Sequence, residues 1–356
     1  MAKQAVLLLA HGTPETVAQI PEYLRNVTGG RPLPPEVVAE IQRRYALIGH
    51  SPLTEITLEQ ARMVEIELSH TSSPQRAKIA RRGPRSRKDQ SQVLRLPFAA
   101  LRVAQNDNRV GHPEIPVYVG MRNWQPYIAD VVRQMRDEGV EEAAVLCLAP
   151  QNSRTSVGLY RRAVGTAIAE EAKSLRVDFT EGWAQHPLLI DAFAERLRPA
   201  WTKLSAEVGA PVPVLFTAHS VPTRTIQASE GQPADPYADE ARHTAELVAA
   251  RVAEIQQWFF AFQSQGVSGG AWLGPTVEET LQSIAASGAK TVLLQPIGFL
   301  CDHVEILYDV DILFRDVAKK LNLRLERPES LNASLPLAKA IADLARHGLE
   351  RLKHGS

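Results

Sequence analysis

Three carboxylates and a histidine stand close together late in the chain, in the stretch DHVEILYD. Apolar residues recur there at helical spacing, so Glu305 and Asp309, four positions apart, are predicted to share one face of a helix. A buried strand is predicted just before them, at Thr291–Pro296. Because open α/β sheets bind ligands at the C-terminal ends of their strands, His303, Glu305 and Asp309 form a candidate site for metal or proton chemistry.

The same residues also have a purely structural explanation. Asp302, followed three positions later by Glu305, resembles a helix capping box with Asp in place of Ser or Thr. Acidic residues are favoured in the first turn of any helix because of the helix dipole, and Asp309 would then be an ordinary solvated acid. A second feature with its own chemical signal is needed to decide between a site and a cap.

That second feature is His219, which follows an apolar strand predicted at Val212–Thr217. A neutral imidazole at the C-terminal tip of a strand is suited to accept a proton or to bind a divalent metal near pH 7. The alternative for a lone histidine is a core residue whose nitrogens bond to backbone groups. Ser220 beside it does not indicate a hydrolase, because no G-x-S-x-G elbow surrounds it, and no Walker loop or G-x-G-x-x-G follows any predicted strand.

The rest of the chain supplies the elements that must position these side chains. Short apolar strands alternate with longer amphipathic stretches, which favours an α/β fold of doubly wound parallel sheets with right-handed crossovers. The strands are predicted at Ala5–Ala10, Val117–Gly120, Ala143–Ala149, Arg176–Phe179, Val212–Thr217, Gly269–Trp272 (a weak pattern) and Thr291–Pro296. The helices are predicted at Pro34–Ile48, Leu58–Leu68, Tyr127–Glu138, Tyr160–Leu175, Leu188–Glu207, Tyr237–Phe262, Val277–Ser287, Asp309–Leu321 and Leu335–Leu352.

The same rhythm in both halves predicts two similar domains. Residues 1–154 are assigned to the first domain and residues 155–332 to the second. The last helix has no strand after it, so residues 333–356 are expected to return to the first domain. The segment Ser72–Arg95, with eight Lys or Arg against the single Asp89, is predicted to be a basic surface insertion.

Composition bounds the class of protein. The 356 residues are 44% apolar and 22% charged, as in globular proteins, and 40 basic residues balance 40 acidic ones. This balance gives no general attraction to nucleic acid or to an anionic membrane. No apolar run is long enough to span a bilayer, and the N-terminus favours a first strand over a signal peptide. Two cysteines, Cys147 and Cys301, predict neither a disulfide framework nor a cysteine-rich metal site, so a cytoplasmic location is expected.

The two candidate strand tips, AHSVP and PIGFLCDHVEILYDVD, strongly resemble those of the ferrochelatases, which insert Fe²⁺ into a porphyrin in haem synthesis. Further blocks match that family in the same order along nearly the whole chain except the basic segment. These are LLAHGTPE, RYALIGHSPLTEIT, VGMRNWQPYI, APQNSRTSVGLYRRA, DPYADE, FQSQG and WLGPTVEETL. The resemblance implies two Rossmann-like four-stranded domains with the porphyrin in the cleft between them.

Position by position, the resemblance implies roles for individual residues. His219 and Glu305 correspond to the essential pair that binds the ferrous ion, facing each other across the cleft. Asp309 corresponds to a position that continues an acidic row, which in the family is thought to relay protons or guide metal, although Leu313 stands where a further acid is common. The porphyrin-binding positions implied are His11, Arg31, Arg44, Ser51, Tyr160 and Trp272, the first of them with an open role. Among these, Arg31, Arg44 and Ser51 match positions that contact porphyrin propionates in one branch of the family, and the added propionates of coproporphyrin III are expected to call on Arg31 and Arg44.

The resemblance also bears on ligands and partners. Fe²⁺ and a porphyrin are expected as substrates, and no permanently bound cofactor is expected, because the C-terminal tail lacks the cysteines that hold an iron–sulfur cluster in some family members. Nucleic acid is not expected as a partner, whereas peripheral membrane contact stays open. Protoporphyrin IX and coproporphyrin III both remain as substrates, with a weak lean to the latter. The alternative functions are a cobalt or nickel tetrapyrrole chelatase and a non-catalytic haem or metal carrier.

Overall fold

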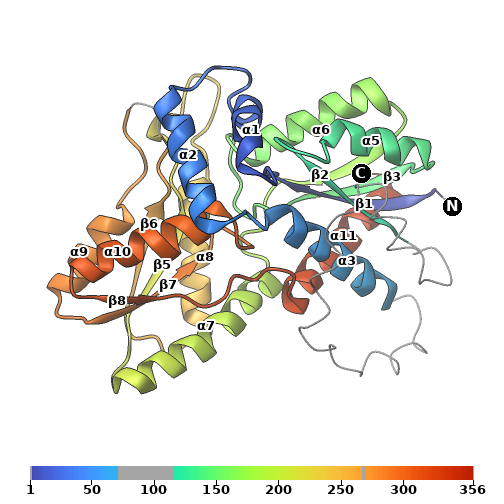
Figure 1. Cartoon of the computed structure of the whole chain (residues 1–356). Coiled ribbons are helices and arrows are strands. Elements are labelled where there is room, and N and C mark those ends of the chain that lie inside the picture. Colours follow the sequence, from blue (N-terminus) through green and yellow to red (C-terminus); the bar gives the residue numbers. More distant parts are fainter. Residues whose placement is uncertain (1, 71–114, 267–269, 356) are drawn as a thin grey trace, which may run out of the picture.

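The computed structural model describes residues 2–70, 115–266 and 270–355. Over these residues the chain forms two parallel four-stranded sheets, ordered β2-β1-β3-β4 and β6-β5-β7-β8, one in each half of the molecule (Figure 1). The predicted α/β fold with two doubly wound sheets is therefore confirmed. The strands are β1 Gln4–Ala10, β2 Val117–Met121, β3 Glu142–Cys147, β4 Arg176–Thr180, β5 Val214–His219, β6 Trp258–Gln263, β7 Thr291–Pro296 and β8 Arg324–Glu326.

Helices cover both faces of each sheet, as buried parallel strands require. In the first half α5 and α6 pack on one face, and α3 and α11 pack on the other. In the second half α7 and α8 cover one face, while α9, α10 and the helix η4 cover the other. The bounds are α1 Ile20–Val27, α2 Pro35–Ile48, α3 Leu53–His70, α5 Ile128–Asp137, α6 Val157–Glu171, α7 Pro187–Val208, α8 Tyr237–Arg251, α9 Val277–Ala286, η4 Glu305–Phe314, α10 Arg315–Lys320 and α11 Leu335–His354.

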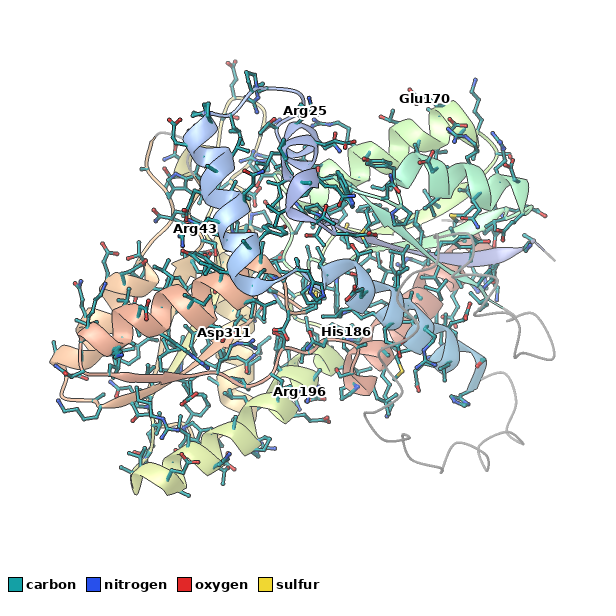
Figure 2. All side chains as sticks on the ribbon, in the orientation of Figure 1. Arg25, Arg43, Glu170, His186, Arg196 and Asp311 are labelled. Atoms are coloured by element: carbon teal, nitrogen blue, oxygen red, sulfur yellow. The ribbon has the colours of Figure 1, made fainter. Side chains whose placement is uncertain are left out.

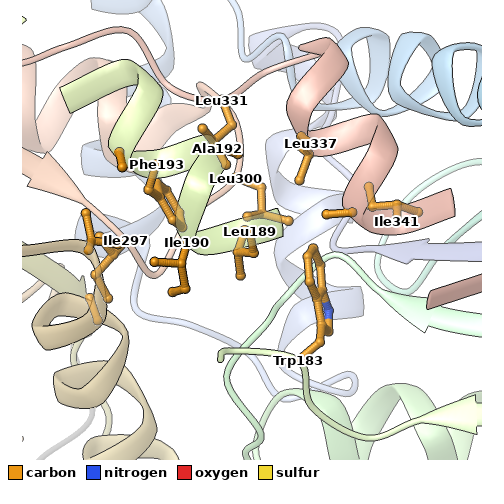
Figure 3. Close-up of a cluster of buried hydrophobic side chains, with 14 of the residues drawn as sticks. Trp183, Leu189, Ile190, Ala192, Phe193, Ile297, Leu300, Leu331, Leu337 and Ile341 are labelled. Atoms are coloured by element: carbon orange, nitrogen blue, oxygen red, sulfur yellow. The ribbon is translucent and has the colours of Figure 1, made fainter. Parts of the chain in front are cut away.

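The two halves share one hydrophobic core. Phe193 and Leu189 of α7 pack with Ile341 of α11 and with Leu300, which follows β7 (Figure 3). A polar contact joins the same two helices, because Nε2 of His186, at the start of α7, lies 3.1 Å from a carboxylate oxygen of Asp343 in α11. Figure 2 places His186 near the middle of the molecule. The interface between the halves is therefore packed, which fixes the strand tips relative to one another.

Several predictions of elements were wrong. The expected boundary at residue 154 is too early, because α6 is followed by β4, which pairs with β3 of the first sheet. The helix expected over Tyr237–Phe262 ends at Arg251 and is followed by strand β6. The weak strand at Gly269–Trp272 is, in its described part, a single bridge between Trp272 and Pro222. Helix α1 and the short strand β8 were not predicted.

The basic segment Ser72–Arg95 lies outside the residues that the structure describes. In the described ranges, no helix is long and apolar enough to cross a membrane.

The helix that carries Glu305 and Asp309 is unusual. η4 is a π-helix, in which each N–H group bonds to the carbonyl group five residues back, and such turns are often found at functional sites. It begins at Glu305 after Val304, and no side chain caps it. Asp302 instead accepts hydrogen bonds from Ser330 and Asn332, so the interpretation of Asp302 and Glu305 as a capping box is wrong.

Candidate active site

A cavity of about 390 Å³ lies where the strand tips of both sheets meet. His11, which follows β1, and Ala149, which follows β3, line it from the first half. His219 at the end of β5 and the segment after β7 line it from the second half. All of these residues stand at C-terminal ends of parallel strands, the usual place for ligands in doubly wound folds.

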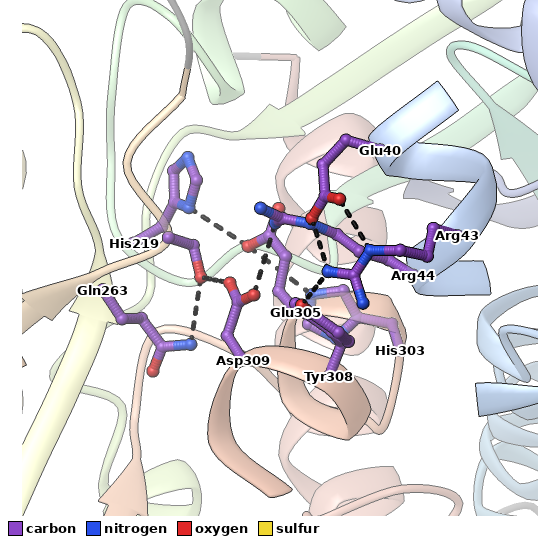
Figure 4. A network of polar contacts seen from close by, with 10 residues as sticks. Glu40, Arg43, Arg44, His219, Gln263, His303, Glu305, Tyr308 and Asp309 are labelled. Carbon is purple, nitrogen blue, oxygen red and sulfur yellow. Dashed lines mark hydrogen bonds and ion pairs between the residues drawn. The ribbon is translucent and has the colours of Figure 1, made fainter. Parts of the chain in front are cut away.

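His219 and Glu305 are in direct contact. Nδ1 of His219 lies 3.1 Å from Oε2 of Glu305, and 35% and 33% of the two side chains remain exposed, enough for a ligand in the cavity to reach them (Figure 4). Both come from the second sheet, where β5 and β7 are neighbours. Both residues lie in the second half, as the assignment of residues 155–332 to one domain implies, and they meet directly rather than across the space between the two halves.

Gly298 explains how the segment after β7 reaches the tip of β5. Its backbone passes so close to β5 that a Cβ atom at this position would lie 2.9 Å from Cα of Ala218, closer than real Cβ contacts allow. The N–H groups of Ile297 and Gly298 both donate to the carbonyl of Thr217. A glycine is needed here because its missing side chain lets the two tips approach.

The electrostatics of the pair favour an imidazolium and a carboxylate. Burial alone would lower the pKa of His219, but the charge of Glu305 outweighs it and the pKa is raised. Burial works to raise the pKa of Glu305, yet the contact with His219 holds it well below its usual value. The two facing atoms, Nδ1 and Oε2, have no well-aligned hydrogen-bond partner among the described residues. A divalent cation bound between them would take the place of the proton and satisfy both atoms.

His303 extends this group. Its Nε2 lies 3.9 Å from the same oxygen of Glu305, and its ring packs on Phe299 with a centroid distance of 4.5 Å. Phe299 also meets the ring of His219, at 6.1 Å. The two imidazoles therefore flank one carboxylate beside a shared aromatic wall. In the described parts of the chain, no three His, Cys, Asp or Glu side chains are arranged to enclose a metal ion.

His11 and Arg122 bring polar groups from the first half. Burial, helped by the charge of Arg122, lowers the pKa of His11 from 6.5 to about 4, so this imidazole is neutral at pH 7. Arg122 lies over the ring of Tyr160, 5.4 Å from its centre. Its Nε atom is buried without a hydrogen-bond partner among the described residues. Arg122 is also the one Lys or Arg among the described residues that line the cavity.

Four of the six predicted porphyrin positions line the cavity: His11, Ser51, Tyr160 and Trp272. Arg31 and Arg44 do not. Arg31 is exposed, and its Nε donates to the carbonyl of Thr28. Arg44 is held at 2.9 Å by Glu40 of the same helix, α2. The predicted roles of all six residues stay predictions.

Asp309 lies beyond the pair, outside the cavity lining. One carboxylate oxygen accepts a hydrogen bond of 2.5 Å from Ser264, and the other lies 3.5 Å from Arg44 (Figure 4). Burial, followed by repulsion from Glu305, raises the pKa of Asp309 from 3.8 to about 6. Asp309 and Leu313 line a separate hollow of about 310 Å³. Asp309 therefore lies between the electrostatic field of Glu305 and a second hollow, and its relay role stays a prediction.

Arg43 makes a related contact between the halves. Its guanidinium donates to the hydroxyl of Tyr308 in η4 at 2.6 Å, and Figure 2 shows it on α2. α2 of the first half is therefore bound to the helix that carries Glu305 and Asp309.

Sequence reasoning missed part of the cavity wall. Arg122, Tyr23, Tyr45, Tyr237 and Phe299 line the cavity and were not predicted as site residues. Arg122 and Tyr45 lie inside sequence blocks that the family resemblance already contained, so those blocks held the available signal. Tyr237 and Phe299 also lie in such blocks, DPYADE and PIGFLCDHVEILYDVD. Tyr23 lies in none of them and reaches the cavity through the packing of α1, which no local pattern reveals.

Comparisons with known proteins agree with this site. The Ferrochelatase family model matches residues 3–95 and 85–349. A ferrochelatase of Acidobacterium capsulatum is 50% identical over 99% of this chain and 96% of that protein. A ferrochelatase of Herpetosiphon aurantiacus is 36% identical over 93% and 94% of the two chains. A coproporphyrin III ferrochelatase of Mycolicibacterium vanbaalenii is 32% identical over 97% and 89%.

Among solved structures, the sirohydrochlorin chelatase SirB of Bacillus subtilis, in complex with cobalt, superposes with a TM-score of 0.52 at 11% identity, covering 99% of this chain and 98% of that one. At this identity the likeness shows a shared fold alone. Taken with the family model and the full-length relatives, the strand-tip histidine and glutamate leave one assignment: the chain belongs to the ferrochelatase family.

Proposed function

We propose that this enzyme inserts Fe²⁺ into a porphyrin held in the cavity between its two sheets. The observation that carries the proposal is the contact of 3.1 Å between His219 and Glu305, with both side chains open to that cavity. A base and an acid beside a pocket with aromatic walls meet the needs of metallation, in which Fe²⁺ enters the ring and two pyrrole protons leave.

The charges of the pair suit an exchange of protons for metal. The carboxylate of Glu305 raises the pKa of His219, which favours the protonated imidazole before metal binds. An incoming Fe²⁺ replaces that proton, and the Glu305 carboxylate balances part of the metal charge. As the metal passes into the ring, the neutral imidazole of His219 accepts one pyrrole proton and the carboxylate of Glu305 takes up the second. Asp309, with a pKa of about 6, can take protons from the pair and release them near pH 7.

The walls of the cavity would hold and bend the macrocycle. Tyr160 and Trp272 present aromatic surface from opposite halves. Rigid elements can use binding energy from the remote parts of a ligand to distort its reacting centre, and metal entry requires a bent porphyrin. Arg122 supplies the positive charge that a porphyrin carboxylate needs.

A further question is which porphyrin the enzyme uses as its substrate. The full-length relatives include proteins named ferrochelatase and proteins named coproporphyrin III ferrochelatase. Protoporphyrin IX and coproporphyrin III differ by two added propionates, which the sequence expectation assigned to Arg31 and Arg44. Initial rates on the two porphyrins with the wild-type enzyme would assign the substrate. A cytoplasmic location and the absence of a resident cofactor remain part of the proposal.

The test is anaerobic mixing of the purified enzyme with Fe²⁺ or Zn²⁺ and each porphyrin, followed by the absorbance bands of the metallated product. We expect turnover by the wild type and a loss of about 10²–10⁴-fold in His219→Ala. The matched control is His347→Ala, which removes a largely exposed histidine of α11. The absence of turnover with any porphyrin would refute the proposal, and wild-type rates in His219→Ala would refute the site.

The same assay separates the alternative functions. A haem or metal carrier would bind one equivalent and stop, whereas an enzyme turns over many times. A cobalt or nickel chelatase would prefer those ions and a sirohydrochlorin-type ring to Fe²⁺ and a porphyrin.

A further inference from the structure

The chain crosses from the second half back to the first along the segment Arg327–Asn332, which connects β8 to α11 and which we call the crossover segment. On its way it passes the segment Leu300–Glu305, which we call the site loop because it carries His303 and Glu305. The two segments are joined by a set of hydrogen bonds that the metal chemistry does not use.

Asp302 and Asn332 form the centre of this set. The backbone N–H of Asp302 donates to Oδ1 of Asn332 at 2.8 Å, and Nδ2 of Asn332 donates to Oδ2 of Asp302 at 3.1 Å. The backbone is paired as well, because the N–H of Asn332 donates to the carbonyl of Leu300 at 2.8 Å. Asn332 thus gives the irregular site loop the kind of hydrogen bonds that a neighbouring strand would provide.

The remaining oxygen of Asp302 is bound by the same segment. Oδ1 accepts a hydrogen bond of 2.7 Å from Ser330 and lies 3.2 Å from the guanidinium of Arg327. That guanidinium also donates two hydrogen bonds, of 2.8 and 2.7 Å, to the carboxylate of Asp311 in η4. The crossover segment therefore holds both the loop before Glu305 and the helix after it.

The crossover segment is itself fixed to the first half. Leu331 and Leu300 are 1% and 3% exposed and pack in the core shared by the two halves (Figure 3). Nε2 of Gln60, in α3 of the first half, donates to the carbonyl of Asn332 at 3.0 Å, and Gln60 lines the cavity. A shift of the site loop would therefore break contacts in both halves.

The backbone conformation of Asn332 is unfavourable, which indicates that this arrangement costs conformational energy. Its φ angle is +47°, in the left-handed region that non-glycine residues rarely adopt. Asparagine is among the few side chains that tolerate this region, and it also supplies both a donor and an acceptor for Asp302. Glycine would fit the backbone equally well but would lose the amide.

We propose that Asp302 and Asn332 are positioning residues for metal insertion: their reciprocal hydrogen bonds fix the site loop so that Glu305 meets His219. The inference rests on the proposed function of that pair. It deepens that function, since a displacement of about 1 Å in a reacting group can cost about 10²-fold in rate. Neither residue lines the cavity or touches His219, so both act through Glu305.

The experiment compares Asn332→Gly, Asp302→Asn and the exchanged double variant Asp302→Asn/Asn332→Asp. Asn332→Gly keeps the backbone conformation and removes the amide. Asp302→Asn replaces the carboxylate oxygen that accepts from Nδ2 of Asn332 by an amide NH₂ group, so that two donors lie opposite each other. The double variant again pairs a carboxylate with an amide, with the two groups exchanged between positions 302 and 332. The matched control is Arg351→Gln, which removes an ion pair with Asp178 that ties α11 to β4, away from the site loop.

Three readouts are needed on the full-length enzyme: kcat/KM for Zn²⁺, the Kd for metal-free porphyrin from fluorescence quenching, and amide hydrogen exchange over residues 300–305. We expect each single variant to lose about 10–100-fold in kcat/KM for the metal with a porphyrin Kd within about twofold. Exchange in the site loop should rise, and the double variant should recover most of the rate. Arg351→Gln should leave all three readouts at wild-type values.

Wild-type kcat/KM in Asn332→Gly, or equal losses in the single and double variants, would overturn the proposal while leaving the proposed function intact. An inactive wild type would refute the proposed function instead. Hydrogen exchange would still show in that case whether Asn332 holds the loop, because this readout does not depend on turnover.

Discussion

Nδ1 of His219 and Oε2 of Glu305 lie 3.1 Å apart because β5 and β7 are neighbours in the second sheet. The histidine ends one strand, and the glutamate begins the helix that follows the other. The pair is therefore one unit, carried by a single sheet, that faces the first half across the cavity.

Because the two residues act as a unit, their substitutions should not add. His219→Ala and Glu305→Gln are each expected to lower kcat/KM for metal insertion by about 10²–10⁴-fold. The double variant should be no worse than the more severe single variant, because either change alone removes the shared metal position. Initial rates by absorbance, with porphyrin Kd as the control for pocket integrity, test this. Fully multiplicative losses would mean that the two side chains act independently.

The protonation state of His219 should depend on Glu305. The pKa of His219 is raised, against the effect of burial, by the carboxylate. In Glu305→Gln burial is opposed only by the smaller effect of the Asp309 charge, so the pKa of His219 should fall from its wild-type value. The imidazole resonances in an NMR pH titration measure this directly. An unchanged titration in Glu305→Gln would contradict the ion pair.

The same shift gives a pH dependence of stability. The folded-state pKa of His219 is higher than its unfolded value, so the pair's contribution to the free energy of unfolding is present below pH 6.5 and is lost as the pH rises through the folded value. Metal uptake should follow the opposite trend, because Fe²⁺ must replace the proton. The rate should therefore rise with pH through a value above 6.5, and a flat profile would contradict this.

Asp309→Asn should stabilise the protein while removing the group proposed to relay protons. The pKa of Asp309 is raised from 3.8 to about 6, and its side chain is 4% exposed. The folded state therefore binds the proton more tightly, and the free energy of unfolding falls as the pH rises from about 4 to about 6. At pH 7.5 the neutral amide should be more stable than wild type by about 2–3 kcal/mol. It should keep the hydrogen bond from Ser264.

Urea unfolding of wild type and Asp309→Asn at pH 4 and pH 7.5 measures the effect. The difference in the free energy of unfolding should be large at the higher pH and small at the lower one. A variant that is less stable than wild type at pH 7.5 would show that the contacts with Ser264 and Arg44 outweigh the burial of the charge.

Arg122 should decide whether the cavity accepts a carboxylated porphyrin. Its buried Nε has no hydrogen-bond partner among the described residues, and its guanidinium lines the cavity. Arg122→Gln is expected to weaken the binding of porphyrins with free propionates by about 10–100-fold, the value of a charge-assisted hydrogen bond. The binding of the corresponding methyl esters should change little. Fluorescence quenching gives both dissociation constants.

Arg31→Gln is the matched control, since Arg31 is exposed and outside the cavity lining. The sequence expectation gave propionate contacts to Arg31 and Arg44 instead. A loss of affinity in Arg31→Gln or Arg44→Gln with none in Arg122→Gln would support that expectation over the one from the cavity.

The sequence by itself determined the elements whose pattern is local. Strand β7 lies at Thr291–Pro296 as predicted, because all six of its residues are buried and the run is apolar. The alternation of strands and helices was enough for the fold class. It failed where no Gly or Pro marks the end of an element: residues 252–257, between α8 and β6, contain neither, so one long helix was predicted over Tyr237–Phe262. The family blocks named His219 and Glu305.

Only the tertiary structure decided which side chains meet. The order of strands in a sheet does not follow the order in the chain, so the sequence placed His219 and Glu305 in one domain but could not show that β5 and β7 are neighbours. For the same reason Asp302 resembled a helix cap, whereas its hydrogen bonds go to the distant crossover segment. Local patterns are set by the burial of neighbouring residues. Contacts between strand tips depend on the packing of the whole chain, and the chemistry of this site is made of such contacts.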